Sequence, residues 1–408
     1  MVRVILLAEA FSTDSPGGRS TLALARGLQA AGFDLRVATF QTPATCPDVL
    51  REEFSVVFLE SGGLVRNVFK HFVPDRSVAV FRRLLDEFRP QIVHSASFQY
   101  GKSRFLIGTA LAAGAKVVLE PWSFDAFCHQ QYAFLDNHPC DACFGGNFLN
   151  AWRNGCDSGV RAWIHAVSRS LIRHSALASG VWFISTGVDM DERLVTYGVS
   201  PERIIRMMVP FNASAFEGRP VSDAGAFVFH GQITRFKGAH LLPEIMRLCP
   251  ETRFEIYPTA EGLRQMRALG IDPQGHPNLR VISGLNWQNG LAEALARARG
   301  ILVPSLWPTI IEIVVVEGLK LGKAVMVFAV GEHKQIFQDG ENAMLADAGN
   351  VNEFAKRVRM VDTDATLRAR LASNGSALYE RLWAPAALRA HLLAAYGRLG
   401  ERVETTRD

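Results

Sequence analysis

Two carboxylates stand inside an aliphatic run, PTIIEIVVVEGLKLGKAV, at residues 308–325. Glu312 and Glu317 lie five positions apart among β-branched residues. Burying a carboxylate costs free energy unless a cation or a hydrogen-bond donor pairs with it. The run is therefore either a plain buried element held by a salt bridge or a part of a ligand site.

The neighbouring residues predict how this run folds. A strand is already expected at residues 300–305, and Gly322 is a typical helix stop. We therefore expect a loop over residues 306–311 and then a short buried helix. Glu312 would lie near the helix N-terminus, where a negative charge is favoured, and an ordinary helix charge is the alternative. Glu317 could accept hydrogen bonds from the vicinal hydroxyls of a sugar.

A pair of glycines opens the first expected helix. In SPGGRST, Gly17 and Gly18 follow a strand, and a helix N-terminus favours an anion. The spacing matches neither a dinucleotide fingerprint nor a P-loop. An ordinary tight turn is the alternative.

Two cations follow a strand in HGQITRFKGAHLL, residues 230–242. Arg235 and Lys237 in such a loop suit a diphosphate, whose charge grows as it leaves. The alternative is a solvated loop.

Four cysteines have the spacing C-x11-C-x2-C-x12-C, at Cys128, Cys140, Cys143 and Cys156. Four thiols with a central C-x-x-C can close a tetrahedral metal site, so structural zinc is predicted. His129 and His138 could complete a mixed ligand set. Unligated thiols, a disulfide pair and an iron–sulfur cluster are the alternatives.

Residues 64–85 are basic and aromatic. The cations lie among three phenylalanines, and they are Arg66, Lys70, Arg76, Arg82 and Arg83. Such a stretch could dock on an anionic membrane. The alternative is a half-buried helix with a solvated basic face.

The length and composition of the chain indicate how many domains it contains and which partners it can bind. The chain has 408 residues, a net charge of +4 and 48% hydrophobic residues, which suits two globular domains. The weak positive charge does not indicate nucleic acid, and it fits an enzyme of anionic substrates. No signal peptide, membrane span or disulfide framework is expected, so we predict a cytoplasmic protein.

Strand-like and helix-like runs alternate and then restart, which indicates two parallel α/β units. Strands are expected at residues 2–9, 34–40, 91–96, 116–121, 180–186, 226–231, 252–258, 279–284, 300–305 and 324–329. Helices are expected at residues 17–32, 75–90, 188–199 and 378–399, the last interrupted at Pro385.

The order of these segments resembles the retaining GT-B glycosyltransferases with an E-x7-E motif, the glycosyl transferases group 1. RPQIVHSAS resembles the family's strand that ends in histidine, and HGQITRFKG resembles its G-R-L-x-x-x-K-G loop. VPSLWPTIIEIVVVEGLKLGKAV resembles P-S-x-x-E-x7-E, and GEHKQIFQDGENAML resembles the segment that follows. The resemblance covers nearly the whole chain, and the order is more specific than any one motif.

The resemblance implies a role for each matching position. Lys237 grips the donor diphosphate and forms the catalytic set with Arg235 and Glu312. Glu317 binds the donor ribose. The other donor-binding positions are Gly17, Gly18, Gly231, Gln232, Thr309, Ile310 and Ile311. His94 and Glu120 lie on the acceptor side.

Three positions depart from the family pattern. Thr309 stands where the first acid of E-x7-E belongs, and Glu312 is the candidate replacement. Gln232 stands where the loop arginine belongs, and Arg235 is the candidate substitute. Glu120 stands at or near the place of a family histidine.

The resemblance implies a GT-B fold, with two Rossmann-like domains facing a central cleft and a C-terminal helix crossing back to the first. The acceptor domain is expected at residues 1–208 with a cysteine-containing insertion at 122–160, the nucleotide-sugar domain at 209–384, and the terminal helix at 385–408.

The expected activity is hexose transfer, with retention, from a UDP- or GDP-linked sugar to a glycan, lipid-linked or small-molecule acceptor. No catalytic metal is required, no nucleic acid is expected, and the inner membrane face is a candidate contact. A degenerate GT-B binding protein and a nucleotide-sugar epimerase are the alternatives. A nicotinamide oxidoreductase is disfavoured because the glycine fingerprint is missing.

Overall fold

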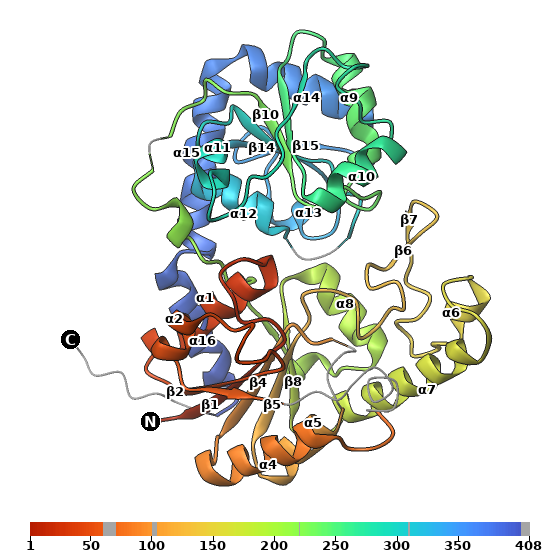
Figure 1. The fold of residues 1–408 in the computed structure, drawn as a ribbon, viewed down its shortest axis with the longest axis vertical. Coiled ribbons are helices and arrows are strands. Elements are labelled where there is room, and N and C mark those ends of the chain that lie inside the picture. The colour runs from red at the N-terminus through yellow and green to blue at the C-terminus, as the bar shows by residue number, and fades with distance from the viewer. Residues whose placement is uncertain (60–70, 100–103, 220, 309–310, 401–408) are drawn as a thin grey trace. The chain divides into compact units, whose positions relative to one another are not determined.

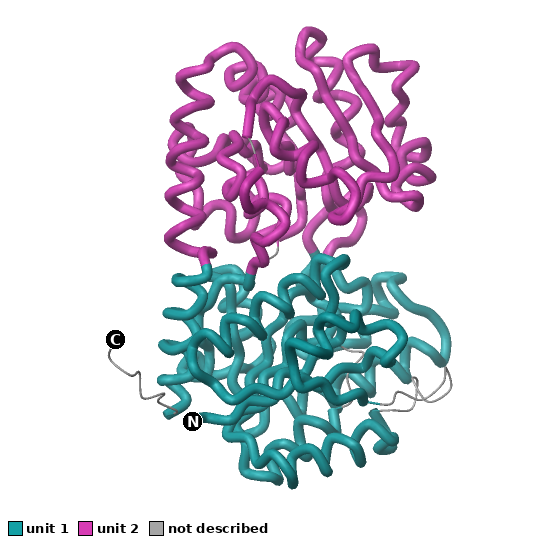
Figure 2. Tube along the Cα trace, turned by 60° about the vertical axis from the view of Figure 1, so that its left-hand side comes forward, with its two compact units in different colours: residues 1–133, 140–210, 385–408 teal, residues 134–139, 211–384 magenta. Residues whose placement is uncertain are grey.

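The chain folds into two compact α/β units (Figures 1 and 2). The computed structural model describes residues 1–59, 71–99, 104–219, 221–308 and 311–400. Unit 1 comprises residues 1–133, 140–210 and 385–408, and unit 2 comprises residues 134–139 and 211–384.

Within the described residues, unit 1 contains a seven-stranded parallel sheet in the order β3-β2-β1-β4-β5-β8-β9. The strands are β1 (Arg3–Ala8), β2 (Asp34–Thr39), β3 (Val56–Phe58), β4 (Ile92–Ala96), β5 (Lys116–Glu120), β8 (Val181–Ser185) and β9 (Ile204–Arg206). The central strands are buried along almost their whole length, as expected of a parallel sheet covered on both faces by helices.

The described helices of unit 1 lie around this sheet, except α6, which lies against α7 away from the sheet (Figure 1). They are α1 (Pro16–Ala30), α2 (Asp48–Glu53), α4 (Arg76–Phe88), α5 (Arg104–Ala112), α6 (Asn150–Arg153), α7 (Gly159–Ala176), α8 (Val188–Tyr197) and α16 (Pro385–Arg398). Two short strands that are assigned to unit 2, β6 (Phe134–Leu135) and β7 (His138–Pro139), form an antiparallel hairpin. The last helix, α16, packs against α1, where Leu388 and Leu392 contact Gly27.

Unit 2 contains a six-stranded parallel sheet in its described part, in the order β12-β11-β10-β13-β14-β15. The strands are β10 (Phe227–His230), β11 (Phe254–Tyr257), β12 (Leu279–Val281), β13 (Gly300–Val303), β14 (Ala324–Phe328) and β15 (Met344–Ala346).

The described helices of unit 2 are α9 (Leu242–Leu248), α10 (Ala260–Ala268), α11 (Leu291–Ala296), α12 (Ile313–Lys320), α13 (His333–Ile336), α14 (Val351–Thr363) and α15 (Ala365–Leu382). Helix α12 lies directly on the sheet. A Cβ atom on Gly318 would come within 2.8 Å of Val325 and 3.2 Å of Ile301. Glycine at this position therefore lets α12 approach strands β13 and β14 closely.

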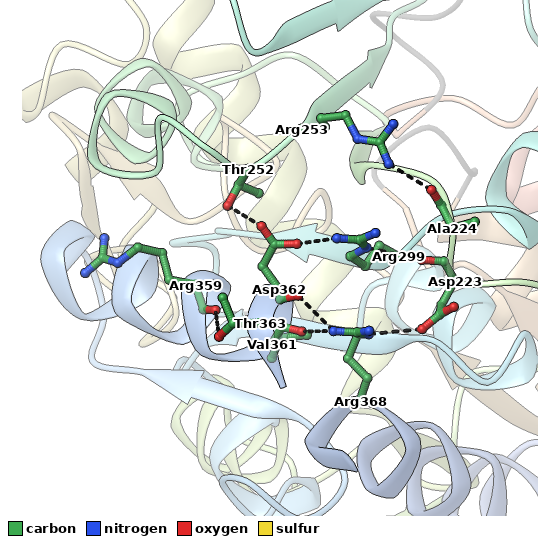
Figure 3. Close-up of polar contacts among 10 residues, drawn as sticks. All are labelled: Asp223, Ala224, Thr252, Arg253, Arg299, Arg359, Val361, Asp362, Thr363 and Arg368. Atoms are coloured by element: carbon green, nitrogen blue, oxygen red, sulfur yellow. Dashed lines mark hydrogen bonds and ion pairs between the residues drawn. The ribbon is translucent and has the colours of Figure 1, made fainter. Parts of the chain in front are cut away.

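A polar network holds α14 and α15 against the amino edge of this sheet (Figure 3). Asp362 lies 2.6 Å from Arg299 and accepts a 2.7 Å hydrogen bond from Thr252. Arg368 donates to Asp223 at 3.0 Å, and this hydrogen bond lowers the pKa of that carboxyl group. The candidate site lies at the opposite edge of this sheet, at the carboxyl ends of its strands.

The predicted fold class is confirmed, and two differences concern helices. The predicted interruption at Pro385 is present, since Pro385 starts α16, a position that suits proline, but the helix before it is longer than expected, because α15 spans Ala365–Leu382. Helix α7, 18 residues long, was not anticipated.

Part of the basic aromatic stretch, residues 64–70, lies outside the described residues. The remainder includes α4, which buries Phe81, Leu84 and Leu85 and exposes Arg82 and Arg83. This arrangement is the half-buried helix with a solvated basic face, and membrane contact stays a prediction. None of the helices in the described part of the chain is long and apolar enough to cross a membrane.

Candidate functional site

Loops that follow three neighbouring strands meet at the carboxyl edge of the unit 2 sheet. Strand β10 is followed by residues 231–238, β13 by residues 304–308 and 311–312 of the described chain, and β14 by the short helix α13. The strands are parallel and adjacent, so their carboxyl ends lie side by side. Open parallel sheets bind their ligands at this edge.

Glu312 is buried and paired at this edge. It is the N-cap residue of α12 and is 7% exposed. One carboxylate oxygen lies 3.4 Å from Lys237 Nζ, and the other lies 2.9 Å from His333 Nε2. Burial by itself would raise the pKa of Glu312, but the charges of Lys237 and His333 outweigh burial and hold it far below its usual range. The carboxylate in the aliphatic run is thus stabilised by two groups from other loops.

Lys237 is held between this carboxylate and an aromatic surface. Its ammonium lies 4.2 Å from the centre of the Trp307 ring, which packs edge-on against Phe236. Burial lowers the pKa of Lys237, and Glu312 opposes that effect only in part. The backbone turn depends on Gly238 at φ 72°, where a Cβ atom would lie 1.7 Å from the carbonyl oxygen of Pro304.

His333 is a site residue that the sequence prediction missed. Its Nδ1 lies 2.9 Å from the carbonyl oxygen of Phe328, and its Nε2 faces Glu312. Both ring nitrogens therefore face oxygen atoms. The sequence feature that could have indicated His333 is its position shortly after β14, which ends at Phe328.

Glu317 lies further along α12 and beside the end of β10. Its carboxylate is 3.2 Å from His230 Nε2, and its side chain is 3% exposed. The ring of His230 also packs edge-on near Trp287, with centroids 6.5 Å apart. His230 is thus a second missed neighbour of a predicted donor-binding residue.

The other predicted residues of unit 2 differ in exposure. Gly231, at φ 117°, follows β10, and Gln232 and Arg235 are exposed in the loop after it. Ile311 is buried. Thr309 and Ile310 lie outside the described residues.

In unit 1, Gly17 and Gly18 lie in the first turn of α1. Gly17 is exposed with open space around it, whereas Gly18 is buried. The Gly18 amide donates a 3.1 Å hydrogen bond to the N-cap residue Ser15. This amide is therefore already used by the helix cap, and the donor-facing role of the pair stays a prediction.

His94 and Glu120 form a buried cluster in unit 1. His94 Nε2 lies 3.1 Å from Glu120 Oε2, and His94 Nδ1 lies 2.8 Å from the hydroxyl of Tyr396 in α16. All three residues are 0% exposed. The cluster joins β4 and β5 to the terminal helix, and its predicted acceptor-side role is untested.

The four cysteines of the insertion are free thiols near one another. Burial first, and then the neighbouring thiols of Cys128, Cys140 and Cys156, raise the pKa of Cys143 to about 12. Their sulfur atoms do not form a group of potential ligands within 4.8 Å in the described structure, and the group that does is His129, Asp157 and His165. The four-thiolate zinc site stays a prediction.

Comparisons with known families agree with this architecture. Residues 17–208 match the glycosyl transferase 4-like domain, and residues 224–364 match the glycosyl transferases group 1 domain. The two matches together cover more than half of the chain. The fold and the two family matches together identify the chain as a GT-B glycosyltransferase. The chain belongs to the group 1 glycosyltransferases.

Solved structures show the same fold at low sequence identity. The chain is similar to sucrose-phosphate synthase from Thermosynechococcus elongatus, with 15% identity, a TM-score of 0.71 and coverage of 98% of this chain and 99% of that one. It is also similar to Anabaena HepE in complex with UDP-glucose, with 14% identity, a TM-score of 0.68 and coverage of 98% and 100%. WaaG, a glycosyltransferase involved in lipopolysaccharide biosynthesis, shares 15% identity with a TM-score of 0.63 and coverage of 98% and 100%. Comparison with curated protein sequences gave no match.

Proposed function

We propose that the protein transfers a hexose from a nucleotide diphosphate sugar, UDP- or GDP-linked, to an acceptor hydroxyl with retention of configuration. The observation that carries the proposal is the Lys237–Glu312–His333 cluster at the carboxyl edge of unit 2, in a chain of the group 1 family. The HepE structures with UDP-glucose and UDP support a nucleotide-sugar donor.

In this proposal Lys237 stabilises the departing diphosphate. The C1–O bond to the diphosphate breaks, its electron pair stays on the diphosphate, and the growing negative charge is offset by the ammonium. Glu312 and Trp307 hold the ammonium in place before the donor arrives, so little reorganisation accompanies the reaction. Arg235, exposed in the same loop, supplies a second cation.

The acceptor hydroxyl forms the new bond on the same face of the sugar. Its proton passes to an oxygen of the departing diphosphate, so the chemistry balances without a separate base. Glycans, lipid-linked saccharides and small molecules remain the predicted acceptor classes.

Glu317 is the proposed ribose contact. Its carboxylate accepts hydrogen bonds from the ribose hydroxyls, while His230 Nε2, 3.2 Å away, holds the carboxylate in position. Because the side chain is 3% exposed, its neighbours have to move slightly to admit the ribose.

The test is a turnover assay with UDP-, GDP-, ADP- and TDP-hexoses, with and without acceptors, in which NMR reports the anomeric configuration. Lys237→Ala is expected to lower turnover by about 100-fold or more, the cost of removing one group that stabilises transition-state charge. Lys334→Ala, which removes an exposed lysine beside His333, should leave turnover unchanged. An inverted product would contradict the retaining mechanism.

A protein that binds but does not turn over the donor is the second candidate. Thr309, in place of the family's first acid, favours it. Absence of both hydrolysis and transfer with every donor, together with nucleotide binding, would establish that alternative.

A further inference from the structure

Two imidazoles and a carboxylate converge at the base of the cysteine-containing insertion in unit 1. His129 lies in the insertion, Asp157 precedes α7, and His165 lies inside α7. Asp157 Oδ2 is 2.7 Å from His165 Nδ1 and 3.5 Å from His129 Nδ1. One ligand atom from each residue lies within 4.8 Å of the other two.

The cluster is largely shielded from water. The side chains of His129, Asp157 and His165 are 15%, 5% and 19% exposed. Among the described residues, the buried His129 Nδ1 makes no hydrogen bond, although it lies 3.5 Å from the Asp157 carboxylate. The three residues line a small cavity, together with Cys143, that has room for about one water-sized sphere. A buried nitrogen that faces a carboxylate without a hydrogen bond, beside such a cavity, is an arrangement that a bound ion would satisfy.

The carboxylate is oriented toward the two imidazoles by its surroundings. Asp157 Oδ1 accepts a 2.9 Å hydrogen bond from the Ser158 amide and lies 3.6 Å from Arg161 Nε. The second oxygen is therefore left facing His129 and His165. In protein metal sites, hydrogen bonds and ion pairs from neighbouring residues to a ligating side chain hold that side chain in the orientation that binds the metal.

Two positive groups, Arg161 and Arg169, oppose a cation here. Arg169 lines the same cavity. One guanidinium nitrogen of Arg169 lies 3.3 Å and 3.4 Å from the carbonyl oxygens of Asp125 and Cys128, so this nitrogen is directed at the insertion backbone. The Asp157 carboxylate offsets part of the charge of the two arginines.

We propose that His129, Asp157 and His165 bind a zinc ion. Nitrogen and carboxylate ligands about 2.0–2.1 Å from a tetrahedral zinc lie roughly 3.3 Å apart, and the observed 2.7 Å and 3.5 Å bracket that separation. Zinc would take the place of the hydrogen between His165 Nδ1 and Asp157, and the neutral imidazole ligand carries its proton on Nε2. The fourth position opens onto the cavity, for a water or for the thiol of Cys143. Such a site would fasten the insertion to α7.

The test uses the full chain with its affinity tag removed, loaded with zinc alone and dialysed. Metal content gives the stoichiometry, and X-ray absorption spectroscopy gives the ligand atoms. His165→Ala removes one ligand, and His138→Ala, on the exposed β6–β7 hairpin, is the matched control. Cys140→Ser tests the competing four-thiolate site. Thermal unfolding checks that each variant is folded.

The expected result is one zinc per chain, bound through nitrogen and oxygen with at most one sulfur. His165→Ala should weaken zinc binding at least tenfold, whereas His138→Ala and Cys140→Ser should not. Two or more sulfur ligands at about 2.3 Å, loss of zinc in Cys140→Ser, or no zinc in the wild-type chain would overturn the proposal. If His165→Ala does not fold, the ligand atoms of the wild-type protein still decide.

Discussion

Replacing Glu312 by glutamine removes the charge that pairs with Lys237 and His333. Breaking a buried ion pair from one side costs about 3–5 kcal/mol, because the remaining charge is left unpaired. The Lys237 side chain is 18% exposed and regains some hydration in the variant. We therefore expect the free energy of unfolding to fall by about 3 kcal/mol, the lower end of that range. For a unit of this size that loss lowers the melting temperature by roughly 6–12 °C.

Calorimetry or denaturant unfolding followed by tryptophan fluorescence measures this loss. Glu244→Gln is the control, because Glu244 forms an exposed ion pair with Arg247 and its loss should leave the transition unchanged. In a double-mutant cycle, Glu312→Gln and Lys237→Met should show a coupling free energy of about 1 kcal/mol or more. Strictly additive effects, or a Glu312→Gln variant as stable as the wild type, would refute the reasoning.

The same contribution has a defined pH dependence. The pKa of Glu312 in the folded protein lies below the ordinary value of 4.5, which we take for the unfolded chain. At a pH between the folded-state and unfolded-state pKa, the folded protein therefore binds fewer protons than the unfolded chain. The stability difference between wild type and Glu312→Gln should therefore be constant above about pH 4.5 and shrink as the pH falls further. A difference that shrinks between pH 7 and pH 5 would contradict this assignment.

Two further predictions concern backbone and hydrogen bonding. Gly238→Ala should destabilise unit 2 far more than Gly270→Ala, because both glycines have φ 72° but only the first would place its Cβ atom against a backbone oxygen, at 1.7 Å. Equal melting temperatures for the two variants would disprove the packing argument. Tyr396→Phe should cost about 1–3 kcal/mol, because it removes a 2.8 Å hydrogen bond to a buried imidazole. Tyr379→Phe is the control, because the buried Tyr379 hydroxyl makes no hydrogen bond within the described part of the chain. Equal losses of unfolding free energy in the two variants would contradict a stabilising His94–Tyr396 hydrogen bond.

The parts of the fold that were predictable are those that local patterns encode. Continuous apolar runs such as residues 324–329 predicted the parallel strands, and Gly322 predicted where α12 ends. Helix α7 was missed because Val160 and Trp163 are exposed, which blurs its apolar face.

The partners in the sites were harder to predict, because they come from distant loops. The burial of Glu312 could be anticipated from its neighbours, but His333 reaches it from the loop after another strand, and no spacing encodes that contact. The cysteine spacing likewise indicated a metal site in the insertion. It could not show that Asp157 and His165 would meet His129 there, because His165 lies within a helix that was not predicted.

Nucleotide binding by the carboxyl edge of unit 2 is the central claim, and a thermal-shift measurement with UDP, GDP, ADP and TDP tests it most directly. One nucleotide should stabilise the wild-type chain by about 2.7 kcal/mol at a hundredfold excess over its dissociation constant. That shift should be lost in Lys237→Ala and Glu317→Ala and retained in Lys334→Ala. No shift with any nucleotide, or an unchanged shift in Lys237→Ala and Glu317→Ala, would contradict the account.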